Sequence, residues 1–129
     1  MFQNNDIAKL IIRLSLGIMM LFHGVEKIIN GIGGVKHLTT NAGFPEFLAY
    51  GVYVGEVVVP IFIILGLYAR VASTFLAFTM FMAIFLAYGN SLFELNKHGA
   101  PVFELPLLYF ILSVVVFLLG SGRYGVNAK

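Results

Sequence analysis

The stretch Val71–Phe93, VASTFLAFTMFMAIFLAYGNSLF, contains no charged residue, and its polar residues are Ser, Thr and Asn. A helix needs about 20 apolar residues to cross a hydrocarbon core of roughly 30 Å, and this segment is long enough. The alternative is a helix in the core of a soluble bundle, which would need a charged face toward water. Because this segment has no such face, it predicts a membrane-spanning helix.

Three further segments have the same apolar character. The whole chain is 60% hydrophobic and 11% charged, with a mean hydropathy of +0.95, whereas a soluble domain carries about 25% charged residues. We therefore predict one all-α domain over residues 1–129, an integral membrane four-helix transmembrane bundle. The predicted spans are Ile7–Val25, Phe47–Ala69, Val71–Phe93 and Leu105–Gly122.

Composition also excludes several functions. The net charge of +2 is too small for a nucleic-acid surface. The absence of cysteine excludes disulfides, thiolate metal sites and thiol redox chemistry by this chain. His37 and His98 fall in predicted loops with no ligand spacing between them, so no metal site is predicted. The run Leu14–Phe22 has the length of a signal-peptide core, but no small-residue cleavage site follows it, and we interpret it as an uncleaved first span.

The connections between the spans predict the topology. Gly66–Arg70 is short and makes the second and third spans an antiparallel hairpin, while Glu26–Glu46 predicts a loop with a short surface helix on the side opposite the termini. Basic residues in short loops favour the cytoplasmic side, which predicts cytoplasmic termini. The basic residues on the side of the termini are Lys9, Arg13, Arg70, Arg123 and Lys129, against Lys27, Lys36 and Lys97 on the other side.

Glu56 is the charge within the second span, on the order of 13 Å along the helix. An ionised carboxylate at such a depth costs a few kcal/mol unless it is protonated, paired or next to water. It is either a proton carrier or polar anchor for a ligand, or a helix-to-helix hydrogen bond or buried ion pair. Pro60, four residues later, removes one backbone hydrogen bond and frees a carbonyl group near Glu56.

The first span supplies the expected partners of Glu56. His23 and Lys27 lie at a compatible depth, and Gly17 and Gly24 would let another helix approach closely. Arg13 lies toward the inner side, where we expect its side chain to snorkel to cytoplasmic water. One face of the first span carries Arg13, Gly17, Met20, Gly24 and Lys27.

Glu104 begins the fourth span on the same side as His23 and Lys27. Its carboxylate either complements the dipole of that helix or joins the other polar side chains in one pocket. No catalytic residue can be assigned. The candidate ligand-binding residues within the membrane are Glu56, His23, Lys27, Glu104 and Arg13.

Several short motifs spread over the chain resemble those of the DoxX family of small bacterial and archaeal membrane proteins. One departure is in the tail, where family members often have an aspartate and this chain has Gly125, Val126 and Asn127. The matching motifs are RLSLG at 13–17, FHGVEK at 22–27, GFP at 43–45, Glu56, LGLYAR at 65–70, HG at 98–99, Glu104 and GSGRY at 120–124.

The resemblance implies a four-helix transmembrane bundle in the bacterial cytoplasmic (inner) membrane. Some relatives look like subunits of quinone-linked sulfur oxidation, such as thiosulfate:quinone oxidoreductase, and others are tied to oxidative-stress complexes or to redox-enzyme maturation. The family has no agreed catalytic set, so the resemblance implies at most a subunit of a membrane oxidoreductase.

We therefore expect a membrane subunit or anchor of a quinone-linked or oxidative-stress redox system. Quinone is the candidate cofactor, in an apolar groove with Glu56, His23 and Lys27 at its polar end, because quinone reduction takes up protons. Lipid, a redox protein and a second copy of the chain are candidate partners. Two alternatives are a proton-coupled small-molecule transporter and a structural membrane partner without activity of its own.

Overall fold

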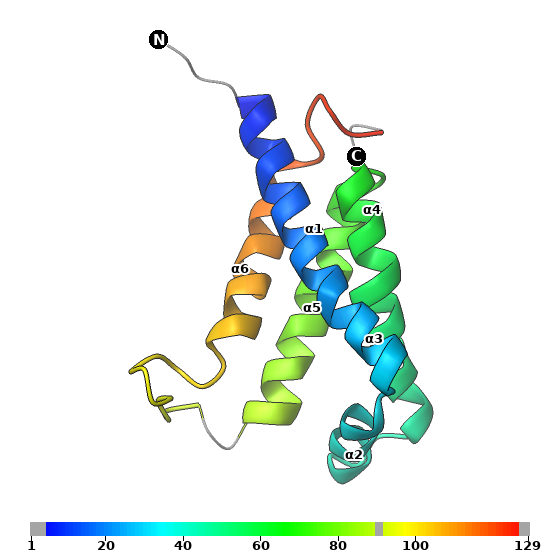
Figure 1. The fold of residues 1–129 in the computed structure, drawn as a ribbon, viewed down its shortest axis with the longest axis vertical. Helices are drawn as coiled ribbons and strands as arrows, with labels where there is room; N and C mark the ends of the chain where they lie inside the picture. Colours follow the sequence, from blue (N-terminus) through cyan, green and yellow to red (C-terminus); the bar gives the residue numbers. More distant parts are fainter. Residues whose placement is uncertain (1–4, 90–91, 127–129) are drawn as a thin grey trace.

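The computed structural model describes residues 5–89 and 92–126, and this part of the chain is built from helices that pack side by side (Figure 1). The predicted all-α fold class is confirmed. The long helices are α1 (Asn5–Asn30), the composite helix Glu46–Leu65, α5 (Ala69–Tyr88) and α6 (Glu104–Leu119). The start of α1 and the end of α6 lie at one end of the bundle, which we call the terminal end, and the connection from α1 to the composite helix lies at the other (Figure 1).

Three of these helices are long and apolar enough to cross a membrane, and α6, with 16 residues, is a shorter apolar helix. The predicted fourth span, Leu105–Gly122, is longer than α6 because Gly120 and Gly122 adopt positive φ angles of 75° and 79°, which end the helix. Residues 90–91, inside the predicted span Val71–Phe93, lie outside the described residues. α5 ends before them at Tyr88.

The composite helix changes its winding along its length. It begins as a 3₁₀ turn η1 (Glu46–Tyr50), continues as α3 (Gly51–Tyr53), widens into a π-helical turn η2 (Val54–Val58) and returns to α-helix as α4 (Val59–Leu65). Pro60 lies in the first turn of α4, where the missing amide hydrogen is tolerated. The helix ends at Gly66, which adopts the left-handed conformation.

The connection from α1 to η1 contains a short helix, α2 (Gly33–Asn41), as the sequence predicted. It packs against η1 at the end of the bundle opposite the terminal end (Figure 1). Lys36 of α2 lies 4.8 Å above the ring of Tyr50 and 3.8 Å from the Glu46 carboxylate. A hydrogen bond with the Tyr50 side chain, supported by the nearby Glu46 charge, raises the pKa of Lys36 above its ordinary value.

The core lies where α1, α4, α5 and α6 meet, and α1 with α4 and α5 with α6 make the most extensive contacts. Large apolar side chains also cover the outer surface: Phe75, Phe78, Phe81 and Phe85 of α5 are each more than half exposed. Such a surface suits lipid and not water. The central buried apolar residues are Leu16, Met20, Ile63, Leu76 and Val116.

Gly17 and Gly24 place the backbone of α1 directly against the composite helix, as their spacing predicted. A Cβ atom on Gly17 would lie 3.0 Å from the Pro60 carbonyl oxygen, and one on Gly24 would overlap the carbonyl group of Glu56. Side chains at these two positions would therefore force the helices apart. Small residues play this part in many packed membrane helices.

We expect Gly24→Ala to lower the free energy of unfolding by about 1–3 kcal/mol, because the new methyl group meets backbone atoms that cannot rotate away. Gly51→Ala is the matched control: a Cβ atom there meets nothing within 4 Å, and alanine favours helix by about 0.5 kcal/mol or more. Unfolding of the purified protein by SDS in mixed micelles measures both variants. Equal stability of the two would contradict the close packing at Gly24.

Candidate functional site

Lys27 and Glu56 form an ion pair within the bundle. Lys27 lies in the last turn of α1, Glu56 lies in η2, and the Lys27 Nζ atom donates a hydrogen bond to Glu56 Oε1 at 2.8 Å. Glu56 is 5% exposed as a residue, and the Lys27 side chain is 20% exposed. One of the two predicted partners of Glu56 is therefore present, and the carboxylate is paired.

The π-helical turn positions Glu56. The Val59 amide donates to the Val54 carbonyl, five residues back, so this turn is wider than an α-helical one. Pro60 has no amide hydrogen with which to continue the α-helical pattern to the Glu56 carbonyl, and that carbonyl faces Gly24. Turns of this kind occur frequently at functional sites.

Two tyrosines contact α1, one at Lys27 and one at His23. Tyr53 donates a hydrogen bond from its hydroxyl group to the Lys27 carbonyl oxygen at 3.4 Å. The ring of His23, one turn before Lys27, packs edge-to-face on Tyr109 of α6, with centroids 5.6 Å apart and planes at 82°. His23 thus contacts α6, and the ion pair of Glu56 is with Lys27.

Neither tyrosine was a candidate from the sequence. Tyr53 was interpretable only as an aromatic residue near the end of a span, although its position three residues before Glu56 was a signal. Tyr109 lies in an uncharged span, and its burial depends on how α6 packs.

Glu104 lies in the first turn of α6, where a carboxylate complements the helix dipole. It is exposed, and neither of the two ion pairs among residues 5–89 and 92–126 includes it. The structure thus brings Lys27 and Glu56 together, with His23 one turn away, and gives Glu104 no hydrogen bond or ion pair with them in the described part of the chain.

Arg13 is buried, with 1% of its surface exposed, so the prediction that its side chain snorkels to water is wrong. Its guanidinium group donates to the carbonyl oxygens of Ile63 at 2.8 Å and Ile64 at 3.2 Å, at the end of α4. It also donates to the carbonyl oxygens of Ser121 and Tyr124 in the tail. The physical reason is that the guanidinium group finds acceptors for its donors inside the protein and so does not need water.

The tail, residues 120–126, folds back over the terminal end of the bundle. The Val126 amide donates to the Leu65 carbonyl at 2.9 Å, and the Gly125 Cα atom packs on Gly66, where a Cβ atom would approach it to 2.5 Å. Together with the Arg13 bonds, these contacts close that end. The glycine-rich motif of the sequence gave no indication of its partner, because the partner groups are backbone atoms.

Two shallow apolar grooves lie on the outer surface. The one along α5, of about 390 Å³, is lined by Val71, Thr74, Phe75 and Phe78. The one along α1, of about 200 Å³, is lined by Ile18, Leu21, Phe22 and Val25. Neither has an ionisable residue in its lining.

Chemically, the pair offers a carboxylate and an ammonium group with no net charge between them. Pairing lowers the cost of holding each charge in a low-dielectric medium. A proton can be shared between Lys27 Nζ and Glu56 Oε1 without a change in that net charge. The site can therefore join α1 to η2, and it can exchange a proton with a third group that reaches Lys27.

Known proteins resemble this chain along most of its length. A family model described as DoxX matches residues 8–89. "Putative oxidoreductase CatD" of Bacillus subtilis is 27% identical over 116 residues, which cover 90% of this chain and 81% of that protein. A Haemophilus influenzae protein titled "Uncharacterized protein" is 30% identical over 122 residues, covering 92% of this chain and 87% of that protein. No solved structure matches the chain significantly.

We expect Glu56→Gln and Lys27→Met each to lower the free energy of unfolding by about 2–4 kcal/mol, because each leaves one charge unpaired inside the bundle. The double variant should lose less stability than the sum of the losses of the two single variants, with a coupling energy of about 1–3 kcal/mol. The exposed pair Lys36–Glu46, at 3.8 Å, is the control, with a coupling energy of about 0.5 kcal/mol or less. A double-mutant cycle by SDS unfolding measures both, and additive losses at Lys27 and Glu56 would contradict the pair.

Arg13→Leu should lower the free energy of unfolding by about 3 kcal/mol or more, since it removes the hydrogen bonds that join α1 to the end of α4 and to the tail. The free energy of unfolding of Arg13→Lys should lie between those of the wild type and Arg13→Leu, because an ammonium group cannot reproduce the planar fork of donors. Hydrogen exchange should accelerate at the Val126 amide in both variants. Arg123→Leu, on an exposed side chain, is the control, and an equal effect there would refute the role of Arg13.

Proposed function

Because this chain belongs to the DoxX family, we propose that it is a membrane subunit or anchor of a redox system, with the Lys27–Glu56 pair as its polar site inside the membrane. The observation that carries the proposal is the 2.8 Å ion pair between partly buried Lys27 and buried Glu56, which lies on a π-helical turn. Ionisable residues within a membrane are expensive and are usually functional. The redox part is supported by the name of the Bacillus subtilis relative, which is that of an oxidoreductase.

In this role the pair would hold or pass a proton. Membrane redox reactions take up or release protons, and a carboxylate next to an ammonium group can supply one close to the reacting molecule. Lys27 is the more exposed partner, with 20% of its side chain accessible against 7% for Glu56. The proton would therefore enter or leave through Lys27 Nζ, and Glu56 would stabilise the charged ammonium group.

The two grooves described above do not form the quinone site that the sequence led us to expect at Glu56. The Glu56 carboxylate is engaged by Lys27, and the two apolar grooves are lined by neither of these residues nor by His23. A quinone ring would have to displace the Lys27–Glu56 contact to reach the carboxylate. The proposal therefore places no quinone at Glu56, and quinone enters as an outcome of the experiment.

A second candidate is an anchor without activity of its own, in which Lys27 and Glu56 only join α1 to η2. The close packing of Gly24 on the Glu56 carbonyl favours it, because the pair then completes a helix-to-helix contact that already exists. The two candidates differ in whether Lys27 and Glu56 hold or pass a proton. Substitutions at these two residues can distinguish the candidates.

We also propose that the protein lies in the bacterial cytoplasmic membrane with both termini in the cytoplasm. The support is the set of basic residues at the terminal end, of which Lys129 lies outside the described residues. A reporter enzyme fused to the C-terminus, active only in the cytoplasm, tests this orientation.

The functional experiment is complementation of a deletion strain with the wild-type gene, Lys27→Met, Glu56→Gln and the exchanged pair Lys27→Glu/Glu56→Lys. Respiratory electron flow, sensitivity to oxidants and extracted quinone are measured at equal amounts of folded protein. We expect a redox defect on deletion that wild type restores and Glu56→Gln does not. Lys97→Gln, in the loop before α6, is the control and should restore it fully.

A deletion without a redox defect would overturn the proposed function. If every folded variant restores the activity, including those without Glu56, the pair only joins helices and the second candidate holds. Quinone bound to wild type and lost in Glu56→Gln would contradict our exclusion of quinone from this site.

A further inference from the structure

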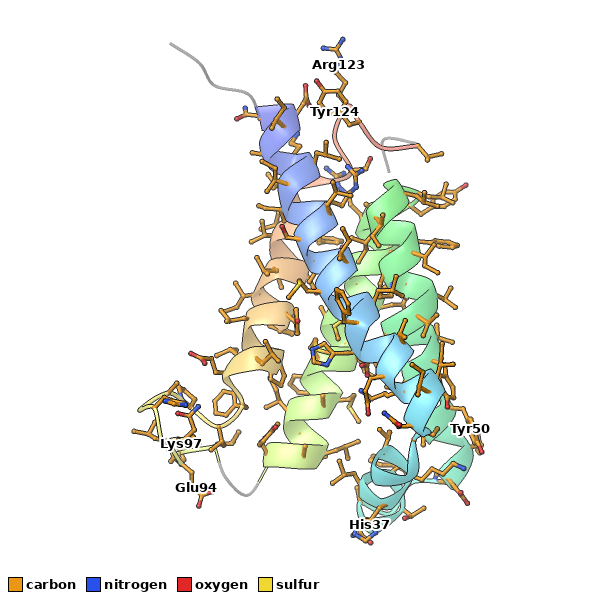
Figure 2. The ribbon with its side chains drawn as sticks, viewed as in Figure 1. His37, Tyr50, Glu94, Lys97, Arg123 and Tyr124 are labelled. Atoms are coloured by element: carbon orange, nitrogen blue, oxygen red, sulfur yellow. The ribbon has the colours of Figure 1, made fainter. Side chains whose placement is uncertain are left out.

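The described charges are segregated between the two ends of the bundle. Labelled Arg123 and Tyr124 lie at the terminal end, and labelled Glu94, Lys97 and His37 lie at the other (Figure 2). Both ion pairs among residues 5–89 and 92–126, Lys27–Glu56 and Lys36–Glu46, belong to the end opposite the termini. The terminal end therefore carries an excess of positive charge. Its described charges are Asp6 and the basic residues Lys9, Arg13, Arg70 and Arg123.

Arg70 is the exposed cation of this end that the fold places beside a groove. It is the second residue of α5, and its guanidinium group leans on Gly120, where a Cβ atom would lie 3.1 Å from its Nε atom. Because Gly120 has no side chain, the guanidinium group is held at the rim between the start of α5 and the end of α6.

The larger apolar groove begins directly after Arg70. Its lining residues Val71, Thr74, Phe75 and Phe78 follow one face of α5, and Arg70 precedes Thr74 by one turn on that face. Val71, Phe75 and Phe78 are 55%, 56% and 64% exposed. An exposed cation thus precedes, along α5, a groove lined by three apolar side chains and Thr74.

We propose that Arg70 and this groove bind one anionic phospholipid. The phosphate would accept hydrogen bonds from the guanidinium group, whose planar donors match phosphate oxygens. An acyl chain would lie along Val71, Phe75 and Phe78. Charge complementarity selects an anionic lipid, since Lys9 and Arg123 add to the positive potential at the same end and basic residues at headgroup level attract anionic lipids.

The test uses the purified full chain in nanodiscs or detergent with phosphatidylglycerol or phosphatidylcholine as the added lipid. Native mass spectrometry counts retained lipid, and thermal unfolding measures its effect. We expect retained phosphatidylglycerol to fall about fivefold in Arg70→Gln and to fall in Phe78→Ala. Arg70→Lys should retain part of the binding, because it keeps the charge.

The controls are Lys97→Gln, a cation at the other end, and Phe81→Ala, an exposed phenylalanine of α5 outside the groove lining. Both should retain phosphatidylglycerol as wild type does. The proposal is overturned if Arg70→Gln and Lys97→Gln retain equal amounts of phosphatidylglycerol. It is also overturned if the wild type retains phosphatidylcholine to the same extent, or if inorganic phosphate alone gives the same stabilisation. Circular dichroism at equal protein concentration shows that each variant is folded.

Discussion

The close approach of the α1 backbone to the backbone of the composite helix is the constraint on which the rest of this structure depends. At Gly17 and Gly24, α1 lies against the carbonyl oxygens of Pro60 and Glu56. This approach brings Lys27 within hydrogen-bonding distance of Glu56. It also sets the depth at which Arg13 meets the end of α4. Polar groups in lipid must find their partners inside the protein, and here one close approach supplies partners at both ends of α1.

Lys27, which is partly buried, and Arg13, which is buried, follow the same rule with different acceptors. Lys27 meets a carboxylate, and the pair is neutral. Arg13 meets backbone carbonyl oxygens at the end of α4 and in the tail, so its charge is shared among dipoles. The first arrangement keeps a group that can exchange a proton. The second keeps a group that stays protonated and holds chain segments together.

The sequence was sufficient for the fold class, because an uncharged stretch such as Val71–Phe93 admits few alternatives. It reduced the partners of Glu56 to Lys27 or His23 and indicated the close approach at Gly17 and Gly24, since helical spacing and depth follow from counting residues, but it did not choose between the two partners. It was insufficient for Arg13, since its partners are carbonyl oxygens, which every residue possesses. The π-helical turn was equally hidden, because the one extra residue in a helical turn leaves no mark on an apolar sequence.

The closing of the terminal end by the tail has a consequence for biosynthesis. Two of the acceptors of Arg13, Ser121 and Tyr124, follow it by 108 and 111 residues, so Arg13 leaves the ribosome well before they do. Until those residues are made, the nascent first helix must hold a guanidinium group that lacks two of its four eventual acceptors. Docking of residues 120–126 therefore becomes the event that completes the assembly at this end of the bundle.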